Sequence, residues 1–202
     1  GERVRRRGVA AVTLLGRRPV KGTEDPWVRQ VAVEVADPAS YKAHIPGHDA
    51  AISTLGVGEP SKVSKEDFIK IDKDMTLAFA SACRAEGVKH FELLSSVGVS
   101  PSSSTFYLRT KGELEDGLKA LEFERLSLFH PSMILTPTNR YGLAQGLTLA
   151  VWPKLNLILQ GPGRKLRGVP VAQLGGAIAR NIQAPGEGVE VLEWDDFKRL
   201  KG

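Results

Sequence analysis

The sequence predicts an α/β fold in which a parallel sheet is covered by helices on both faces. Short apolar runs rich in Val, Ile and Thr each stop at a turn signal, and segments with apolar residues three and four apart lie between them. Strands that alternate with helices of about ten residues or more need crossover connections, and these make the strands parallel. Ligands of such sheets bind beyond the carboxyl ends of the strands.

Six strands are expected, at 9–15, 28–35, 50–55, 90–96, 125–135 and 189–192. The first run is apolar throughout and ends at Gly16, which is typical of a strand buried on both faces. The second run alternates instead, and it places Val31, Val33 and Val35 on one face. Pro131 interrupts or ends the fifth strand, because proline has no backbone N–H to donate to a sheet.

Helices are expected at 65–86, at 106–121 and within 169–182, where a short strand start precedes the helix. Gly87 is placed to end the helix at 65–86 as a C-cap. After Thr136 the rhythm of strand and helix changes, with an apolar stretch at 141–159 and a turn at 161–163. Residues 1–202 are therefore predicted to form a single domain, with a core at 1–135 and a smaller substrate-side region at 136–202.

Composition excludes several classes of protein. The 202 residues are 42% hydrophobic and 25% charged, which suits one globular domain and excludes a disordered, fibrous or membrane-spanning chain. The single Cys83 excludes a disulfide scaffold, fits a reducing compartment and is predicted to lie in the core. His44, His48, His90 and His130 lack the spacing of a zinc site, so no metal is predicted.

A net charge of +5 fits either a nucleic-acid partner or a pocket for an anionic ligand. The densest basic run is Arg3 with Arg5, Arg6 and Arg7, and the rest of the chain mixes both signs. No basic stripe with interleaved aromatic residues follows, so nucleic-acid binding is not predicted.

Tyr107 and Lys111 are the residues with the clearest chemical signature. They lie four apart on a predicted helix, so the ammonium can approach the phenol and favour its ionised form. A phenol of lowered pKa can pass a proton to or from a carbonyl or alcohol, and a serine at a strand end, Ser95 or Ser96, can hold the same oxygen. The pair taken alone also occurs by chance on exposed helices; the preceding Ser-Ser strand end favours the chemical interpretation.

A second group of candidates follows the first strands. In a dinucleotide-binding sheet, arginine after the strand that faces the adenosine ribose accommodates a 2′-phosphate, so Gly16-Arg17-Arg18 favours NADP over a merely solvated turn. Gly56 after Leu55 would let the backbone approach a ligand closely. Asp37 could accept from an adenine amino group, although Asp37-Pro38 is also an ordinary turn sequence.

The order of these motifs resembles the Tat-interacting-protein-like oxidoreductases, an atypical branch of the short-chain dehydrogenases/reductases. The resemblance runs from about residue 9 to about 135 and continues faintly through 167–171, and it rests on the segments 12–18, 47–56, 68–74, 89–96 and 107–113. It implies a Rossmann-type doubly wound sheet that binds NADP(H), with 1–135 as the nucleotide-binding core. The catalytic centre that it implies is a Ser-Tyr-Lys set.

The resemblance assigns a role to each candidate. Tyr107 would be the catalytic acid/base, Lys111 would lower its pKa and hold the nicotinamide ribose, and Ser96 rather than Ser95 would orient the substrate. The cofactor-binding residues would be Gly16, Arg17 and Arg18 for the 2′-phosphate, Asp37 for the adenine, Leu55 and Gly56 for the cofactor backbone, and Pro131 beside the nicotinamide.

The sequence departs from the family pattern in two places within the resemblance. His130-Pro131-Ser132 stands where the family tends to have Arg-Pro-Gly, which leaves the pocket on the nicotinamide side open to question. Lys70 and Asp72 occupy the stretch that often supplies an Asn to the proton relay.

A third departure concerns the beginning of the chain. The family has a strand and a glycine-rich phosphate-binding turn before the strand that here begins near Val9, and 1–8 would be only the tail of the first helix. The sheet is therefore expected to be split by a gap with two unpaired apolar edges. The strand could lie in an N-terminal segment of the native protein, come from a partner, or be truly lost with the fold adapted; we favour the first.

Three functions are compatible with these observations. The first is NADP(H)-dependent hydride transfer to or from a small carbonyl or alcohol, favoured by Ser96, Tyr107, Lys111 and Arg17. The second is a catalytically idle subunit of a larger assembly, with a structural nucleotide or none, and the third is an NADPH-sensing regulator. The chain is expected to be cytoplasmic or organellar, with the mitochondrion as one option.

Overall fold

The computed structural model describes residues 8–23, 25–137, 156 and 158–200, and its strands all pair in parallel. The predicted basic run at 3–7, the tail at 1–8 apart from Gly8, and most of the apolar stretch at 141–159 lie outside the described residues. Strands β1 (Val12–Gly16) and β2 (Val28–Ala32) form one pair. Strands β3 (Ala50–Ser53), β4 (His90–Leu94), β5 (Arg125–Phe129) and β8 (Gly188–Leu192) form a second sheet in that order.

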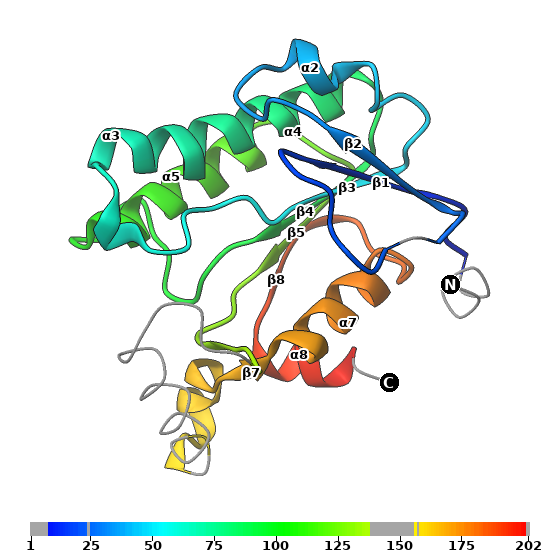
Figure 1. Ribbon diagram of the computed structural model, residues 1–202. Helices are drawn as coiled ribbons and strands as arrows, with labels where there is room; N and C mark the ends of the chain where they lie inside the picture. The colour runs from blue at the N-terminus through cyan, green and yellow to red at the C-terminus, as the bar shows by residue number, and fades with distance from the viewer. Residues whose placement is uncertain (1–7, 24, 138–155, 157, 201–202) are drawn as a thin grey trace.

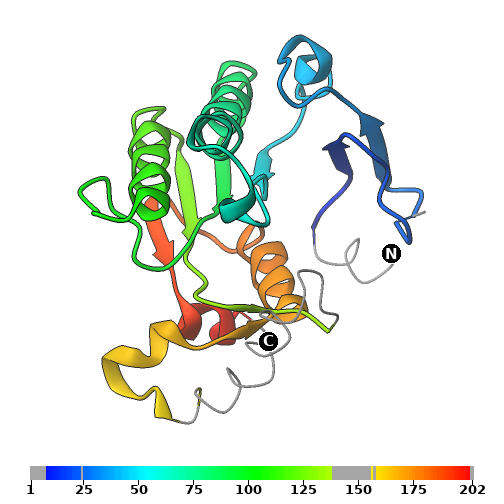
Figure 2. The same ribbon diagram turned by 60° about the vertical axis from the view of Figure 1, so that its left-hand side comes forward.

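The expected split of the sheet is confirmed within the described residues. β1 and β3 are end strands of separate sheets, and no described strand pairs with the other edge of either one. Figure 2 shows the β1–β2 pair set apart from the four-stranded sheet. His48 links the two parts, because its Nε2 lies 2.9 Å from Thr13 Oγ1 on β1 and its Nδ1 lies 2.9 Å from Ile45 O.

Helices cover both faces of the four-stranded sheet. One layer contains α3 (Lys65–Phe68), the π-helical turn η2 (Ile69–Asp74), α4 (Met75–Ala85) and α5 (Phe106–Lys119), and the other contains α7 (Val171–Asn181) and α8 (Trp194–Arg199) (Figure 1). The short helix α2 (Ala39–Lys42) follows β2. A second small pair joins β6 (Ile134–Leu135) to β7 (Val169–Pro170), and the 3₁₀ turns η1 (Pro60–Lys62) and η3 (Gly161–Leu166) complete the described elements.

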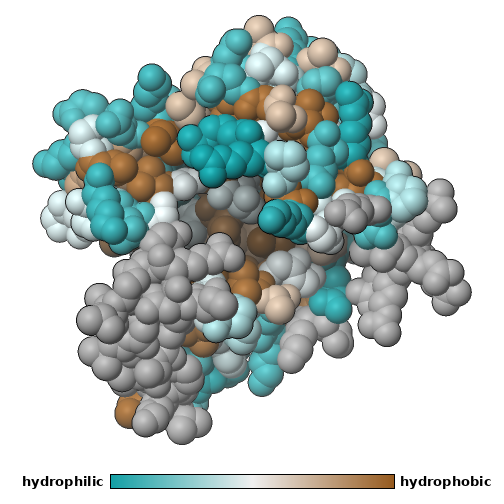
Figure 3. All heavy atoms as spheres, in the orientation of Figure 1, coloured by the Kyte–Doolittle hydropathy of each residue, from teal (hydrophilic) through white to brown (hydrophobic). Residues whose placement is uncertain are grey.

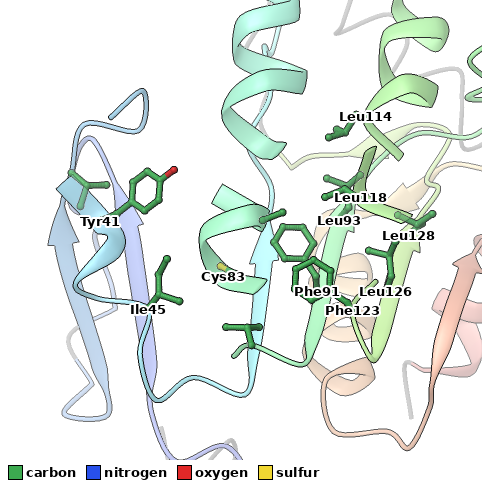
Figure 4. Close-up of a cluster of buried hydrophobic side chains, with 13 residues drawn as sticks. Tyr41, Ile45, Cys83, Phe91, Leu93, Leu114, Leu118, Phe123, Leu126 and Leu128 are labelled. Carbon is green, nitrogen blue, oxygen red and sulfur yellow. The ribbon is translucent and has the colours of Figure 1, made fainter. Parts of the chain in front are cut away.

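The core has one apolar cluster on each face of the sheet. The larger cluster lies under α4 and α5 and includes Phe91 and Leu93 of β4 with Leu114 and Leu118 of α5, all fully buried. Figure 4 shows Tyr41 and Ile45, from the segment after β2, directed toward the α4 side of this cluster, and the Tyr41 and Phe79 rings meet edge to face at 5.7 Å. The split sheet is thus held together by side chains packed across it. The second cluster packs β5 and β8 against α7 and α8, and consists of Phe129, Val169, Leu174, Ala177, Ile178, Leu192 and Phe197.

Most predicted elements are confirmed, with shorter bounds. The strand expected from residue 9 begins at Val12, and the strand expected at 125–135 is broken from His130 to Met133, next to Pro131. The segment expected as one α-helix at 65–86 is helical but passes through the π-helical turn η2. Gly87 has a φ of 85°, as a C-cap glycine requires. Helices α2 and α8 were not predicted.

Cys83 lies in the larger core cluster, as predicted, and burial raises the pKa of its thiol to about 12. In the part of the chain that the structure describes, no helix is long and apolar enough to cross a membrane.

Candidate active site

Helix α5 presents Tyr107, Lys111 and Glu115 at intervals of four residues, so all three lie on one side of the helix. The loop after β4 approaches this helix so closely that a Cβ on Gly112 would collide with the backbone of Ser100 and Pro101. The contact is completed by Ser100 N, which donates to Leu108 O at 3.2 Å. Glycine is therefore required next to Lys111 to bring the end of β4 against α5.

The first contact in the site joins Tyr107 to Ser96. The Ser96 side chain lies beside the phenol of Tyr107, where hydrogen bonding lowers the pKa of that phenol, and the Tyr107 ring packs on Phe68 with 5.6 Å between ring centroids. Burial raises the pKa of Tyr107, the Ser96 hydrogen bond lowers it, and the negative charge of Asp72 raises it. The pKa of Tyr107 is raised overall, so the lowering expected from Lys111 is not observed.

The Lys111 ammonium is engaged elsewhere. Its Nζ lies 2.7 Å from Asp72 Oδ1, and both side chains are buried. Asp72 Oδ2 accepts a hydrogen bond from Val57 N at 2.7 Å, in the loop after β3. A Cβ built on Gly56 would lie 3.0 Å from Asp72 Oδ1 and 3.8 Å from Lys111 Nζ. The fold therefore brings together Gly56, Asp72 and Lys111 from three separate elements.

A buried polar cluster lies one turn further along α5. Ser95 Oγ donates to Glu115 Oε1 at 2.5 Å, and His130 Nε2 lies 2.7 Å from the same oxygen. Ser95 follows β4 and His130 follows β5, so Glu115 ties the carboxyl ends of two neighbouring strands to α5. Because Ser95 is bonded to Glu115, it is Ser96 that contacts Tyr107. Buried Pro131, which was predicted beside the nicotinamide, accepts through its carbonyl from Val97 N at 3.0 Å.

The candidates after the first strands lie at the carboxyl ends of β1 and β2, in the separate two-stranded sheet. Gly16 ends β1, Arg17 and Arg18 follow it with exposed side chains, and Gly16 and Arg18 help to line a small hollow beside β1 and β2. Asp37 is exposed after β2, but its Oδ1 accepts from Ala39 N at 3.0 Å at the start of α2. The turn interpretation of Asp37 therefore describes its contact in this structure.

These groups face one side of the molecule. The carboxyl ends of β3, β4 and β5 carry Leu55 and Gly56, Ser95 and Ser96, and His130 and Pro131 respectively. The space-filling view shows a hollow at the centre of the face drawn in Figure 1, between the layer of α3, α4 and α5 and the part formed by α7 and α8 (Figure 3). Its position agrees with the rule that ligands bind beyond the carboxyl ends of parallel strands.

Two site residues were not assigned a role from the sequence. Glu115 continues the four-residue spacing of Tyr107 and Lys111, and this spacing is the signal that could have found it. Asp72 was noted only as a departure from the family pattern. Its contact with Lys111 joins residues 39 positions apart, and no local spacing reveals a contact of that range.

A second polar network is buried on the α7 face, away from these residues. Asn181 on α7 donates through Nδ2 to Glu92 Oε1 at 2.9 Å and to Ser127 Oγ at 2.9 Å. Arg125 Nε donates to Glu190 Oε1 at 2.7 Å, and Glu92 Oε2 has no hydrogen-bond partner among the described residues. Burial raises the pKa of Glu92 to about 8.

No group of three or more His, Cys, Asp or Glu that could hold a metal ion occurs in the described ranges. The four histidines have separate environments. His44 faces Arg29, His48 reaches β1, His90 belongs to the α7-side network and His130 bonds Glu115.

The chain has both sequence relatives and structural neighbours. A protein-family model described as NAD(P)H-binding matches residues 2–126. Protein HTATIP2 of Rattus norvegicus is 34% identical over 187 residues, which are 90% of this chain and 74% of that protein. Protein fmp52, mitochondrial, of Emericella nidulans is 32% identical over 126 residues, 60% of this chain and 54% of its own length. The matched part thus spans only a little over half of the fungal relative.

Solved structures support the fold at low sequence identity. MoeE5 in complex with UDP-glucuronic acid and NAD has a TM-score of 0.69 at 16% identity, covering 95% of this chain and 70% of that one. Uronate dehydrogenase from Agrobacterium tumefaciens has a TM-score of 0.62 at 16% identity, covering 95% of this chain and 71% of that one. The parallel sheet, the helices on both faces and these neighbours define a Rossmann-like fold. The family match and the rat relative show that the chain belongs to the NAD(P)H-binding family and is a Tat-interacting-protein-like member of it.

Proposed function

We propose that the protein is an NADP(H)-dependent oxidoreductase that transfers hydride to or from a small carbonyl or alcohol. The observation that carries the proposal is the placement of Ser96, at the carboxyl end of β4, beside the phenol of Tyr107 on α5, with Lys111 one turn further along that helix. A serine and a tyrosine whose hydroxyl groups meet can both bond one substrate oxygen, and tyrosine can exchange a proton with it.

The residues present fit the nicotinamide end of the cofactor. Gly56 has no Cβ, so the backbone of the loop after β3 approaches Asp72 and Lys111 more closely than a residue with a side chain would allow. Lys111 carries three N–H donors, of which the contact with Asp72 needs one, so the others can serve a ribose. NADP(H), when bound, supplies or accepts the hydride.

The protein's own groups would handle the proton. In the reductive direction Tyr107 gives its phenolic proton to the carbonyl oxygen as negative charge develops there, while Ser96 donates a hydrogen bond to the same oxygen. Tyr107 is protonated at neutral pH, as a proton donor in this direction must be, and its raised pKa makes it a weaker acid than an ordinary tyrosine. Lys111, fixed by Asp72, provides a positive charge beside the reacting groups.

The preference for NADP(H) over NAD(H) rests on Arg17 and Arg18. Both follow β1 with exposed side chains, so their guanidinium groups are free to meet a 2′-phosphate bidentately. The structural neighbour MoeE5 is described in complex with NAD, and a comparison of NADPH with NADH tests the preference of this chain.

The experiment is a comparison of wild type with Tyr107→Phe in an NADPH oxidation assay over a panel of small aldehydes and ketones. We expect the variant to lose at least about 100-fold in kcat, because an acid/base group contributes about 10²–10⁴, while NADPH binding measured by fluorescence stays the same. Equal turnover in the two proteins would reject the role of Tyr107.

A catalytically idle subunit of a larger assembly is the second candidate. Its supporting observations are the Lys111 ammonium held by Asp72, the raised pKa of Tyr107, and His130 in place of the arginine of the family pattern. NADPH binding without turnover on any carbonyl of the panel, together with co-purifying protein partners, would favour this candidate.

A mitochondrial location is proposed from the fungal relatives, which are named mitochondrial. Fractionation of cells that express the full-length native protein would test it, and recovery in the cytosolic fraction alone would reject it.

A further inference from the structure

Asp72 is a buried carboxylate that contacts two other elements of the fold. It lies in the π-helical turn η2 with 2% of its surface exposed, and both of its carboxylate oxygens are used. Wide helical turns of this kind occur frequently at functional sites. We propose that Asp72 is a positioning residue whose carboxylate joins Lys111 on α5 to the loop after β3. This inference rests on the proposed function of Tyr107 and Lys111.

The two oxygens of Asp72 act on different elements. Oδ1 lies 2.7 Å from Lys111 Nζ, and Oδ2 accepts from Val57 N at 2.7 Å. A buried ammonium without a partner is strongly destabilising, so Asp72 supplies the counter-charge that Lys111 needs in this position. A single side chain thereby sets the distance between the predicted cofactor loop and the predicted catalytic helix.

Gly56 supports the same interpretation from the other side. A Cβ at this position would be 3.0 Å from Asp72 Oδ1, a distance at which the carboxylate would have to move. The loop therefore packs its backbone directly on the Asp72–Lys111 pair. Any displacement of Asp72 would be transmitted to the loop and to Lys111 together.

Asp72 also acts on Tyr107. Its negative charge raises the pKa of the phenol. Ser96 after β4 is the other polar group that acts on the phenol, and Phe68 of α3 covers the ring. Asp72 would therefore favour the protonated Tyr107, the form that donates in carbonyl reduction.

The test compares Asp72→Asn with a matched control, Lys73→Met. Lys73 is the next residue of η2, and its Nζ pairs with Glu113 Oε2 of α5 at 2.8 Å in a partly exposed ion pair. Both variants remove one charged contact between the same two elements, but only Asp72 touches Lys111 and Val57. The side chain of Asn has nearly the shape of Asp and retains one acceptor oxygen.

The first readout is the ionisation of Tyr107, followed by tyrosinate absorbance and obtained by subtracting the same titration in a Tyr107→Phe background. We expect the Tyr107 midpoint to move to lower pH in Asp72→Asn and to stay unchanged in Lys73→Met. A purely structural role for Asp72 would leave this midpoint in place.

The second readout is hydrogen exchange at the Val57 amide. We expect about tenfold faster exchange in Asp72→Asn, because Asn can orient its one acceptor toward Lys111 or toward Val57 but not toward both. Wild-type values for both the Tyr107 midpoint and the Val57 exchange rate in Asp72→Asn would overturn the proposal.

Two further outcomes are informative. If Asp72→Asn does not fold, the double variant Asp72→Asn with Lys111→Met must restore folding, because the second substitution removes the unpaired ammonium. A double variant that also fails to fold overturns the proposal. Neither readout needs turnover. A shifted Tyr107 midpoint in a protein that reduces no carbonyl would therefore reject the proposed function and leave the positioning role of Asp72 in place.

Discussion

Replacement of Glu92 by Gln should remove a specific loss of stability that develops as the pH rises toward about 8. Glu92 is fully buried on β4, and burial raises the pKa of its carboxyl from 4.5 to about 8. Asn181 and Arg125 oppose this increase, whereas Glu190 adds to it. Between pH 4.5 and about 8, the folded chain retains a proton that the unfolded chain has released, so a rise in pH favours unfolding.

The size of the effect follows from the same pKa values. Each pH unit in this window lowers the free energy of unfolding by about 1.4 kcal/mol, so the wild type loses about 2 kcal/mol between about pH 6.5 and about pH 8. The window begins there because His90, whose pKa burial lowers from 6.5 to about 4, has the opposite effect at lower pH. Glu92→Gln keeps the oxygen that accepts from Asn181, but its side chain cannot ionise. The fall in the free energy of unfolding with rising pH should therefore be absent from this variant.

The assay is urea unfolding of both proteins at several pH values from about 6.5 to 9. We expect Glu92→Gln to be the more stable protein already at pH 6.5, because the folded wild type holds its proton from pH 4.5 upward. We expect this advantage to grow by about 2 kcal/mol more and to level off above about pH 8. Glu124→Gln is the control, because Glu124 is exposed and pairs with exposed Lys89 at 3.3 Å. Stability curves of wild type and Glu92→Gln that stay parallel across this range would refute the assignment of a protonated, buried Glu92.

Three further outcomes can be measured. Gly112→Ala should lower the free energy of unfolding by about 1–3 kcal/mol, because its Cβ would collide with the Ser100 backbone; an unchanged urea midpoint would contradict this close contact. Cys83 should react with a thiol reagent at pH 8 only as the protein unfolds, since it is buried with a pKa of about 12, and rapid labelling of the native state would count against it. Replacing Arg17 and Arg18 with Ala should weaken the binding of NADPH at least about tenfold more than that of NADH, and an unaltered ratio in fluorescence titrations would remove the 2′-phosphate assignment.

Local pattern was sufficient for most of the fold. Short apolar runs rich in Val, Ile and Thr that stop at turn signals, with amphipathic helices between them, led to the parallel sheet because each pattern reflects which faces are buried. The split between β1 and β3 was also foreseen, since the motif order contained no strand to lie between them. The π-helical turn η2 was missed, because apolar spacing does not distinguish one wide turn from regular helix.

The candidate site was foreseen in part for the same reason. Tyr107 and Lys111 share a face of one helix, so their neighbourhood is a local property, and the strand that ends in Ser95 and Ser96 is local as well. Which of the two serines lies next to Tyr107 could not be read from nearby residues in the sequence. It depends on Glu115, which bonds Ser95 and leaves Ser96 to Tyr107.

By itself, the sequence determined the class of fold, the family and the helix that carries the tyrosine and the lysine. Only the tertiary structure decided the partner of Lys111, because Asp72 and Lys111 come from different helices and their 2.7 Å contact exists only when both pack on the same sheet. The same packing buries Tyr107 and sets Asp72 against it, so its pKa is raised where the Tyr-Lys spacing alone suggested a lower one. Spacing along a helix reports which side chains can be neighbours, whereas desolvation and charge depend on everything that packs around them.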